Sequence, residues 1–253
     1  MASKQKTTFA LFFGNRGFFP ASLFEQARKE LPQVLEKKGY GYLMMDASAT
    51  RHGAVETPDE GRIYARWLKQ HDGEFDGVIV CLPNFGDETG AVTALKDAGV
   101  PILIQAYPDE LDKMAPEVRR DAFCGKFSIM DVFHQYGVKF TALKPHTVAP
   151  TSPRFGDQVD QFAAICRAVA SMKDMVVGVV GARTTAFKTV RIDELALQRH
   201  GITMETFDLS HVFDRMNKLD ADGKPYKDKA GKLRSYSDWS GVPDVSFDKL
   251  VRL

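Results

Sequence analysis

The sequence predicts an α/β protein: a doubly wound parallel-sheet domain followed by a second, smaller α/β domain that we expect to be incomplete. Two patterns carry this prediction. Short apolar runs alternate with helical patterns, and the run GVIVCLP (Gly77–Pro83) is apolar throughout, as in strands covered on both faces. A proline-containing stretch of little periodicity, Lys144–Arg154, separates two such alternating segments. We therefore place the domains at residues 1–150 and 151–253.

The first domain is expected to contain five strands and four helices. Its helices show apolar residues at helical spacing, and one begins with the favourable pair Thr57 as N-cap and proline at the next position. Strands are predicted at Thr8–Phe13, Tyr42–Asp46, Gly77–Pro83, Pro101–Ala106 and Lys139–Leu143. Helices are predicted at Ala21–Lys38, Thr57–His71, Glu88–Ala98 and Arg120–Tyr136.

The second domain starts with a long helix, Phe155–Met172, whose apolar residues recur at helical spacing. A buried strand is predicted at Met175–Ala182, followed by a helix that ends at His200 and a strand at Thr203–Phe207. After about Asn217 the chain becomes polar and rich in glycine. Two strands make a small sheet, so we expect this domain to be incomplete.

Composition excludes several classes of partner. Thirty-four basic against 33 acidic residues leave a net charge of +1, which favours neither nucleic acid nor an acidic membrane. The segment MASKQKTT lacks the apolar core of a signal peptide, and no apolar run is long enough to span a membrane. The cysteines Cys81, Cys124 and Cys166 lie far apart, which is typical of a reducing compartment. We expect a cytoplasmic protein.

The first candidate site residue is Arg16, in the string Gly14-Asn15-Arg16-Gly17 that follows the first strand. The glycines permit unusual backbone angles, and the guanidinium offers several donors in a rigid fork. This arginine either holds an anionic or polyhydroxylated ligand or faces water. The spacing is not that of a dinucleotide-binding G-x-G-x-x-G motif, which argues against a nucleotide-dependent oxidoreductase.

A second cluster, LPNFGDE, follows the third predicted strand, and ligands of doubly wound sheets bind beyond the carboxyl ends of the strands. Asn84, Asp87 and Glu88 could bind hydroxyl groups, and Phe85 could cover an apolar sugar face. The alternative is a helix start, because acidic residues favour the N-terminal end of a helix.

Other motifs are less specific. Gln105 and the helix start Arg119–Asp121 could line the same crevice or could simply be structural. The loop Gly181–Arg191 suits an anion or a polyol, or alternatively a threonine-capped helix start. The histidines are scattered without metal-binding spacing, and no nucleophile elbow is present.

Six strings, taken together, resemble the L-fucose/L-arabinose isomerase family, especially its L-fucose isomerase-like branch. The resemblance implies a metal-dependent aldose–ketose isomerase that uses Mn²⁺ as a Lewis acid and moves a proton through an ene-diol. It also implies a homo-oligomer in which the first domain contributes substrate-binding residues to a neighbouring subunit, and Arg16, Asn84 and Phe85 match these by position. The strings are GNRGFFPASL, HGAVET, LPNFGDE, LIQAYPDELDKM, RRDAFCGK and GARTTAFKTVR.

One departure from the family matters for catalysis. The family's metal ligands and acid/base carboxylates lie in a later part of the chain, and this sequence ends at Leu253. The resemblance therefore implies no metal ligand and no identifiable catalytic residue here, and a chain that is inactive alone. Lys188 also departs from the neutral polar residue expected in its motif. The alternative reading is a sugar-binding or sensor module of two α/β lobes without catalysis.

Overall fold

The computed structural model describes residues 6–20, 22–183 and 185–252. Three predicted positions, Ala21 at the start of a helix, Thr184 in the Gly181–Arg191 loop and Leu253, lie outside these residues. The chain forms two compact units, Met1–Ser171 and Met172–Leu253. The first unit runs past residue 150, because helix α5 (Pro153–Met172) packs its buried face, including Phe155 and Phe162, against the first sheet.

The first unit is built on a four-stranded parallel sheet, and the predicted α/β fold class is confirmed. The strand order is β2-β1-β3-β4. From β1 the chain first adds β2 on one side and then β3 and β4 on the other, so the strand order reverses between β1 and β3. In the register, Phe13 pairs with Cys81 and Leu82 pairs with Ala106. The carboxyl ends of β1, β3 and β4 therefore lie side by side. The strands are β1 (Thr8–Phe13), β2 (Gly41–Met44), β3 (Gly77–Leu82) and β4 (Ile102–Ala106).

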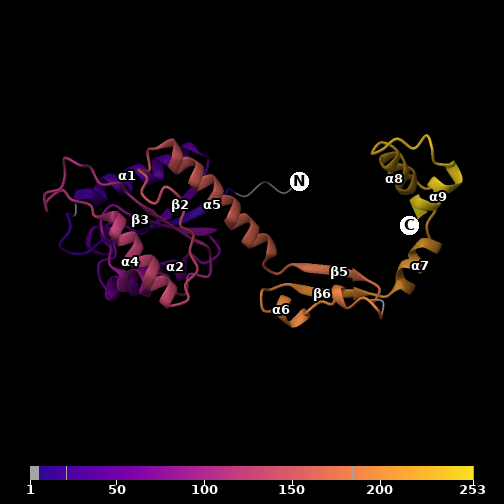
Figure 1. Ribbon diagram of the computed structural model, residues 1–253, viewed down its shortest axis with the longest axis horizontal. Coiled ribbons are helices and arrows are strands. Elements are labelled where there is room, and N and C mark those ends of the chain that lie inside the picture. Colours follow the sequence, from indigo (N-terminus) through magenta and orange to yellow (C-terminus); the bar gives the residue numbers. More distant parts are fainter. Residues whose placement is uncertain (1–5, 21, 184, 253) are drawn as a thin grey trace. The chain divides into compact units, whose positions relative to one another are not determined.

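Helices cover both faces of this sheet (Figure 1). Helices α1 (Ser22–Lys37) and α5 pack on one face, and α2 (Pro58–Gln70), α3 (Glu88–Leu95) and α4 (Ala122–Gln135) pack on the other. Side chains of β1 alternate between the two layers, with Phe9, Leu11 and Phe13 toward α1 and α5 and Phe12 toward the opposite layer. Period-two alternation explains how a continuously apolar strand serves both cores.

The predicted helix cap of α2 is confirmed. The side chain of Thr57 accepts a hydrogen bond from the backbone N–H of Glu60, and Pro58 opens the helix. The fifth predicted strand, Lys139–Leu143, is wrong. Only Thr141 pairs there, as an isolated bridge to Leu103 on the outer edge of β4. One residue in register cannot continue a strand, so this segment is an irregular edge.

The second unit contains a two-stranded parallel sheet and four α-helices within residues 172–183 and 185–252. Strand β5 (Val176–Val180) was predicted to be buried, which is wrong: Val180 is 60% exposed. Two strands offer little surface for helices to cover, and one face of the sheet is open. The helix predicted up to His200 is reduced to the short α6. The other elements are β6 (Thr203–Phe207), α6 (Glu194–Gln198), α7 (Leu209–Asn217), α8 (Lys224–Arg234) and α9 (Asp244–Arg252).

None of the helices in the described part of the chain combines the length and the apolar content that crossing a lipid bilayer requires.

Candidate functional site

A pocket of about 300 Å³ opens at the carboxyl edge of the four-stranded sheet, where the loops after β1, β3 and β4 meet. This edge, at the reversal of strand order, is where doubly wound proteins bind ligands. A larger hollow of about 480 Å³ lies at the amino end of β4, away from these loops. The pocket is lined by Arg16, Phe18 and Phe19 after β1, by Phe85 after β3, and by Met114, Pro116, Arg119 and Asp121 after β4.

Arg16 is the charged residue that the loop after β1 contributes to the pocket wall. Its Cζ lies 4.2 Å from the centroid of the Phe85 ring, and its Nη2 donates a hydrogen bond to Oε2 of Glu88. The ring of Phe19 stacks on Phe85, with 5.9 Å between the centroids. A cation over an aromatic face gains about 0.5–2 kcal/mol, depending on its desolvation. Arg16 is therefore held in the wall from two sides, which favours its prediction as a pocket residue over the solvated alternative.

The loop that carries Arg16 is anchored to the start of α2. The backbone N–H of Asn15 donates to the carbonyl of Val55 (3.1 Å), and its side-chain Nδ2 donates to Oε1 of Glu56. The Glu56 side chain is only 6% exposed and also pairs with Arg51 at 3.2 Å. Sequence reasoning missed Glu56, because nothing in its local pattern shows that it meets a loop 41 residues earlier.

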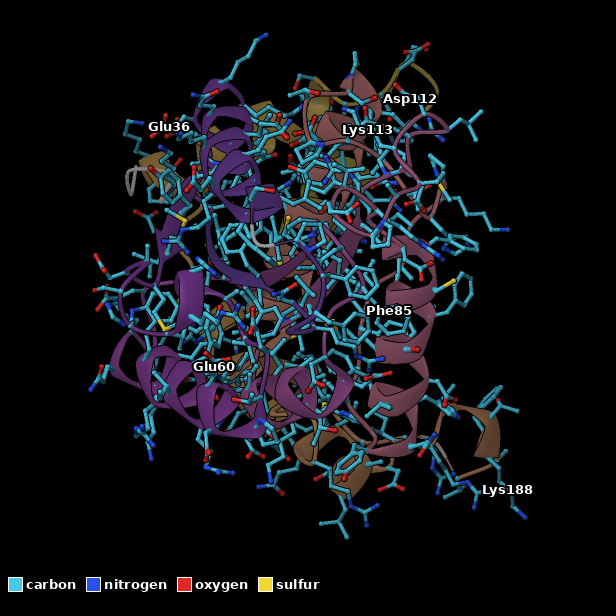
Figure 2. All side chains as sticks on the ribbon, turned by 90° about the vertical axis from the view of Figure 1, so that its left-hand side faces the viewer. Glu36, Glu60, Phe85, Asp112, Lys113 and Lys188 are labelled. Carbon is cyan, nitrogen blue, oxygen red and sulfur yellow. The ribbon has the colours of Figure 1, made fainter. Side chains whose placement is uncertain are left out.

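The turn that carries Phe85 packs directly on helix α4, and Figure 2 shows Phe85 beside this helix. A Cβ added at Gly125 in α4 would lie 1.5 Å from the carbonyl oxygen of Phe85. Only glycine fits at this contact. Gly86, the next residue of the turn, has a φ of 76°, which favours glycine as well. An isolated glycine in a helical pattern was the signal that could have indicated Gly125.

The remaining predicted site residues, Asn84, Asp87 and Glu88, do not line the pocket. Asn84 is fully buried, and neither its Nδ2 nor its Oδ1 has a hydrogen-bond partner among the described residues. Asp87 is the N-cap of α3, since its Oδ1 accepts the backbone N–H of Gly90 at 2.6 Å. Glu88 pairs with Arg16. Substrate binding by Arg16, Asn84, Phe85, Asp87 and Glu88 stays a prediction.

The third wall comes from the loop between β4 and α4. Arg119 and Asp121 line the pocket and form an ion pair of 3.1 Å. Arg120, between them, points into the protein and is buried. Gln105, the polar residue near the end of β4, is buried and donates from Nε2 to the carbonyl of Val148 (2.7 Å). Gln105 therefore connects strand β4 to the segment that contains Val148.

Helix α4 also carries a buried amine. The Nζ of Lys126 donates to the carbonyl of His146 at 2.9 Å, and its side chain is almost completely covered. Burial lowers the pKa of Lys126 to about 8. This lysine joins α4 to the segment that follows the irregular edge of the sheet.

The described residues do not provide a metal site of the implied kind. Within residues 6–20, 22–183 and 185–252, no three His, Cys, Asp or Glu side chains are grouped so that they could hold a metal ion. In the second unit, the Gly181–Arg191 loop lines a separate hollow of about 330 Å³ with Arg183 and Arg191.

Comparison with known proteins gives the family. A family model described as "Fucose/sulfoquinovose isomerase, N-terminal domain" matches residues 10–173. The chain belongs to this family. The matched residues exceed half of the 253-residue chain and contain most of β1, all of β2 to β4, α5 and the whole pocket. No match was found among curated proteins. The fucose isomerase-like resemblance of the sequence strings is thus confirmed for the N-terminal part, and the chain carries a sugar isomerase N-terminal domain.

Proposed function

We propose that this chain supplies the substrate-covering wall of an aldose–ketose isomerase that acts on a free sugar through an ene-diol. One observation carries the proposal: in a sugar isomerase N-terminal domain, an arginine lies over an aromatic ring in a pocket at the ligand-binding edge of the sheet. Phe18, Phe19 and Phe85 would cover the C–H face of a sugar and exclude water. Arg16 would donate hydrogen bonds to its hydroxyl groups with the donors that Glu88 leaves unused.

The proposed reaction in the complete enzyme depends on Mn²⁺, which acts as a Lewis acid when bound. The described residues do not fit this role, because they offer no group of three ligating side chains. We therefore assign to this chain only the binding and covering of the sugar. The acid/base carboxylates and metal ligands would belong to another part of the assembled enzyme.

We further propose that the pocket is completed by a neighbouring subunit of a cytoplasmic homo-oligomer. The support is the exposure of apolar side chains that line it: Phe18 is 78% exposed and Met114, in the third loop, is 50% exposed. Monomeric proteins rarely leave contiguous apolar rims open to water, and such rims mark surfaces that are covered on assembly.

Saturation-transfer difference NMR with L-fucose tests the binding role directly. We expect a saturable signal with the wild-type chain that is lost in Arg16→Ala and Phe85→Ala. Arg62→Ala is the matched control. Arg62 is an exposed arginine of α2 that pairs with Asp59, and it does not line the pocket. Equal binding by Arg16→Ala and by the wild type would overturn the proposed role of the pocket.

Two measurements separate this proposal from the sensor alternative: a titration with Mn²⁺, followed by the paramagnetic resonance of the free ion, and calorimetry of L-fucose binding with a chelator present. We expect no tight stoichiometric Mn²⁺ site on the chain and weak sugar binding. A tight Mn²⁺ site would contradict the proposal that this chain binds the sugar while another part of the enzyme binds the metal. Tight sugar binding without metal would instead favour a non-catalytic binding module.

A further inference from the structure

Arg120 is the most deeply buried arginine of the described chain, and the function proposed above gives it no role. Its side chain is only 7% exposed. Its neighbours Arg119 and Asp121 both line the pocket, whereas Arg120 points away from it. Charged groups are rarely buried unless their partners hold them, so its contacts are informative.

The guanidinium of Arg120 connects the ends of two strands to the start of α4. Nη1 donates to the carbonyl of Pro83 (3.0 Å), the last residue before Asn84 and Phe85. Its Cζ lies 4.6 Å from the centroid of the Tyr107 ring, at the end of β4, and Nη2 lies 3.7 Å from Glu110. One side chain thus contacts the loops after β3 and β4, while its chain neighbours Arg119 and Asp121 line the pocket.

The partners of Arg120 are themselves fixed. The hydroxyl of Tyr107 donates to Oε2 of Glu30 in α1 at 2.8 Å, and its backbone N–H donates to Leu82 at 3.0 Å. Burial, foremost, raises the pKa of Tyr107, so this hydroxyl keeps the proton that it donates. The ring under Arg120 is therefore a rigid platform, and the position of the guanidinium follows from the sheet.

The loop between β4 and α4, which precedes and follows Arg120 in the pocket wall, makes few other contacts with the rest of the first unit among the described residues. The loop between Tyr107 and Asp121 contributes Met114 and Pro116 to the pocket, and Met114 is half exposed. At its end, the backbone N–H of Asp121 donates to Oδ1 of Asp109 at 2.9 Å, and Asp121 has a φ of 52°. A strained residue at this junction persists only when its surroundings determine it.

We propose that Arg120 is a positioning residue of the candidate sugar site: it sets the distance between the wall of Met114, Arg119 and Asp121 and the Arg16–Phe85 wall. The inference rests on the function proposed above, because it assigns Arg120 a part in sugar binding. A planar guanidinium suits this task better than an ammonium, since it stacks on Tyr107 and reaches the carbonyl of Pro83 in one geometry.

The test compares Arg120→Ala with the wild-type chain in two independent measurements. The first is L-fucose binding, and the second is the ¹³C-methyl signal of Met114, assigned with Met114→Leu. We expect binding to weaken by about tenfold or more, because small misplacements of a site cost large factors. We also expect the Met114 signal to move. Ethylguanidinium should restore both by filling the vacated space, whereas ethylammonium should not. Arg62→Ala should leave both unchanged.

Several outcomes would overturn the inference. Unchanged binding together with an unmoved Met114 signal in Arg120→Ala would do so, and so would a loss of binding that ethylguanidinium does not reverse. If the alanine variant does not fold, Arg120→Lys takes its place, and an unmoved Met114 signal in that variant overturns the inference. If the wild type fails to bind L-fucose, the proposed function fails, while the Met114 signal still decides whether Arg120 positions the wall.

Discussion

Strands β3 and β5 have nearly the same kind of sequence and opposite surroundings. The runs GVIVCL and VVGVV are both apolar, yet every residue of β3 is buried while residues of β5 alternate between exposed and half-buried. The difference lies in what surrounds them. Strand β3 is central in a sheet with helices on both faces, whereas β5 has a single neighbour, β6. An apolar run therefore predicts a strand, but its burial depends on segments elsewhere in the chain.

The same contrast predicts how stability is distributed between the two units. Parallel sheets are normally covered on both faces, and two-stranded sheets are marginal in water. In the second unit, the side chains of Val180, Phe207 and Phe213 are all about half exposed or more. We expect the first unit to unfold as one cooperative block and the second to open at a much lower free energy.

The largest expected effect on the free energy of unfolding comes from replacing one phenylalanine in each unit. Phe162 is fully buried in α5 and stacks on Phe9 at 5.5 Å, whereas Phe207 in β6 is 51% exposed. Phe162→Ala should lower the free energy of unfolding of the first unit by about 3–5 kcal/mol. Phe207→Ala should lower that of the second unit by about 1 kcal/mol or less.

The two tryptophans make the measurement specific. Trp67 lies in the first unit and Trp239 in the second, so urea unfolding can be followed for each unit by fluorescence after the other tryptophan is changed to phenylalanine. Similar losses for Phe162→Ala and Phe207→Ala would show that Phe207 is packed as tightly as Phe162, against the contrast drawn here.

A glycine-to-alanine pair gives effects of opposite sign. Gly125 in α4 meets the carbonyl oxygen of Phe85, where a Cβ would lie at 1.5 Å, whereas a Cβ at Gly231 in α8 meets nothing within 4 Å. Gly125→Ala should destabilise the first unit by about 3 kcal/mol, because the turn or the helix must move. Gly231→Ala should stabilise α8 by up to about 1 kcal/mol, since alanine favours helix.

The same urea measurements check this pair, and L-fucose binding gives a second readout. We expect Gly125→Ala to weaken binding, because it displaces Phe85, and Gly231→Ala to leave binding as it is. Stabilisation by Gly125→Ala would show that α4 stands farther from the turn than the structure indicates.

These contacts also show which parts of the molecule are readable from sequence. Strand β1 and the cap Thr57 follow from local pattern alone, and so does the placement of Arg16 and Phe85 after strands. The coverage of β5 could not be predicted, because it depends on the number of neighbouring strands.

Within the site, contacts over long separations decide the roles. Glu56, which sequence reasoning missed, meets Asn15 across 41 residues, and Arg120, whose role the sequence left open, meets Pro83 across 37. Asp87 shows that the role of a residue with a local partner can also be ambiguous in sequence. Its position in sequence allowed both a hydroxyl-binding residue and a helix cap, and only the 2.6 Å contact with Gly90 shows the cap that is made. Local chemistry names candidates, whereas partners separated in sequence decide their roles.

The last prediction concerns a charge that the first unit buries and the second does not. Lys126 is buried in α4, whereas every lysine of the second unit is exposed. Burial lowers the pKa of Lys126 to about 8, below its ordinary value near 10.4. Between these values the unfolded chain binds a proton that the folded chain lacks, so this lysine makes stability rise with pH. Below pH 8 both states hold the proton, and the cost of burying the charge is fully present.

The change Lys126→Met isolates this contribution. Burial raises the pKa of Cys166 to about 12 and that of Cys81 further, so these thiols make stability fall at alkaline pH in both proteins and cancel in the comparison. Urea unfolding at pH 7 to 10 should show the wild type gaining on Lys126→Met by at most about 3 kcal/mol. Lys232→Met, at an exposed lysine of α8, should show no such gain. A constant difference between wild type and Lys126→Met across this range would mean that water reaches the amine. In that case Arg120 would still be a buried charge of the first unit, but Lys126 would add only apolar coverage to the contrast between the units.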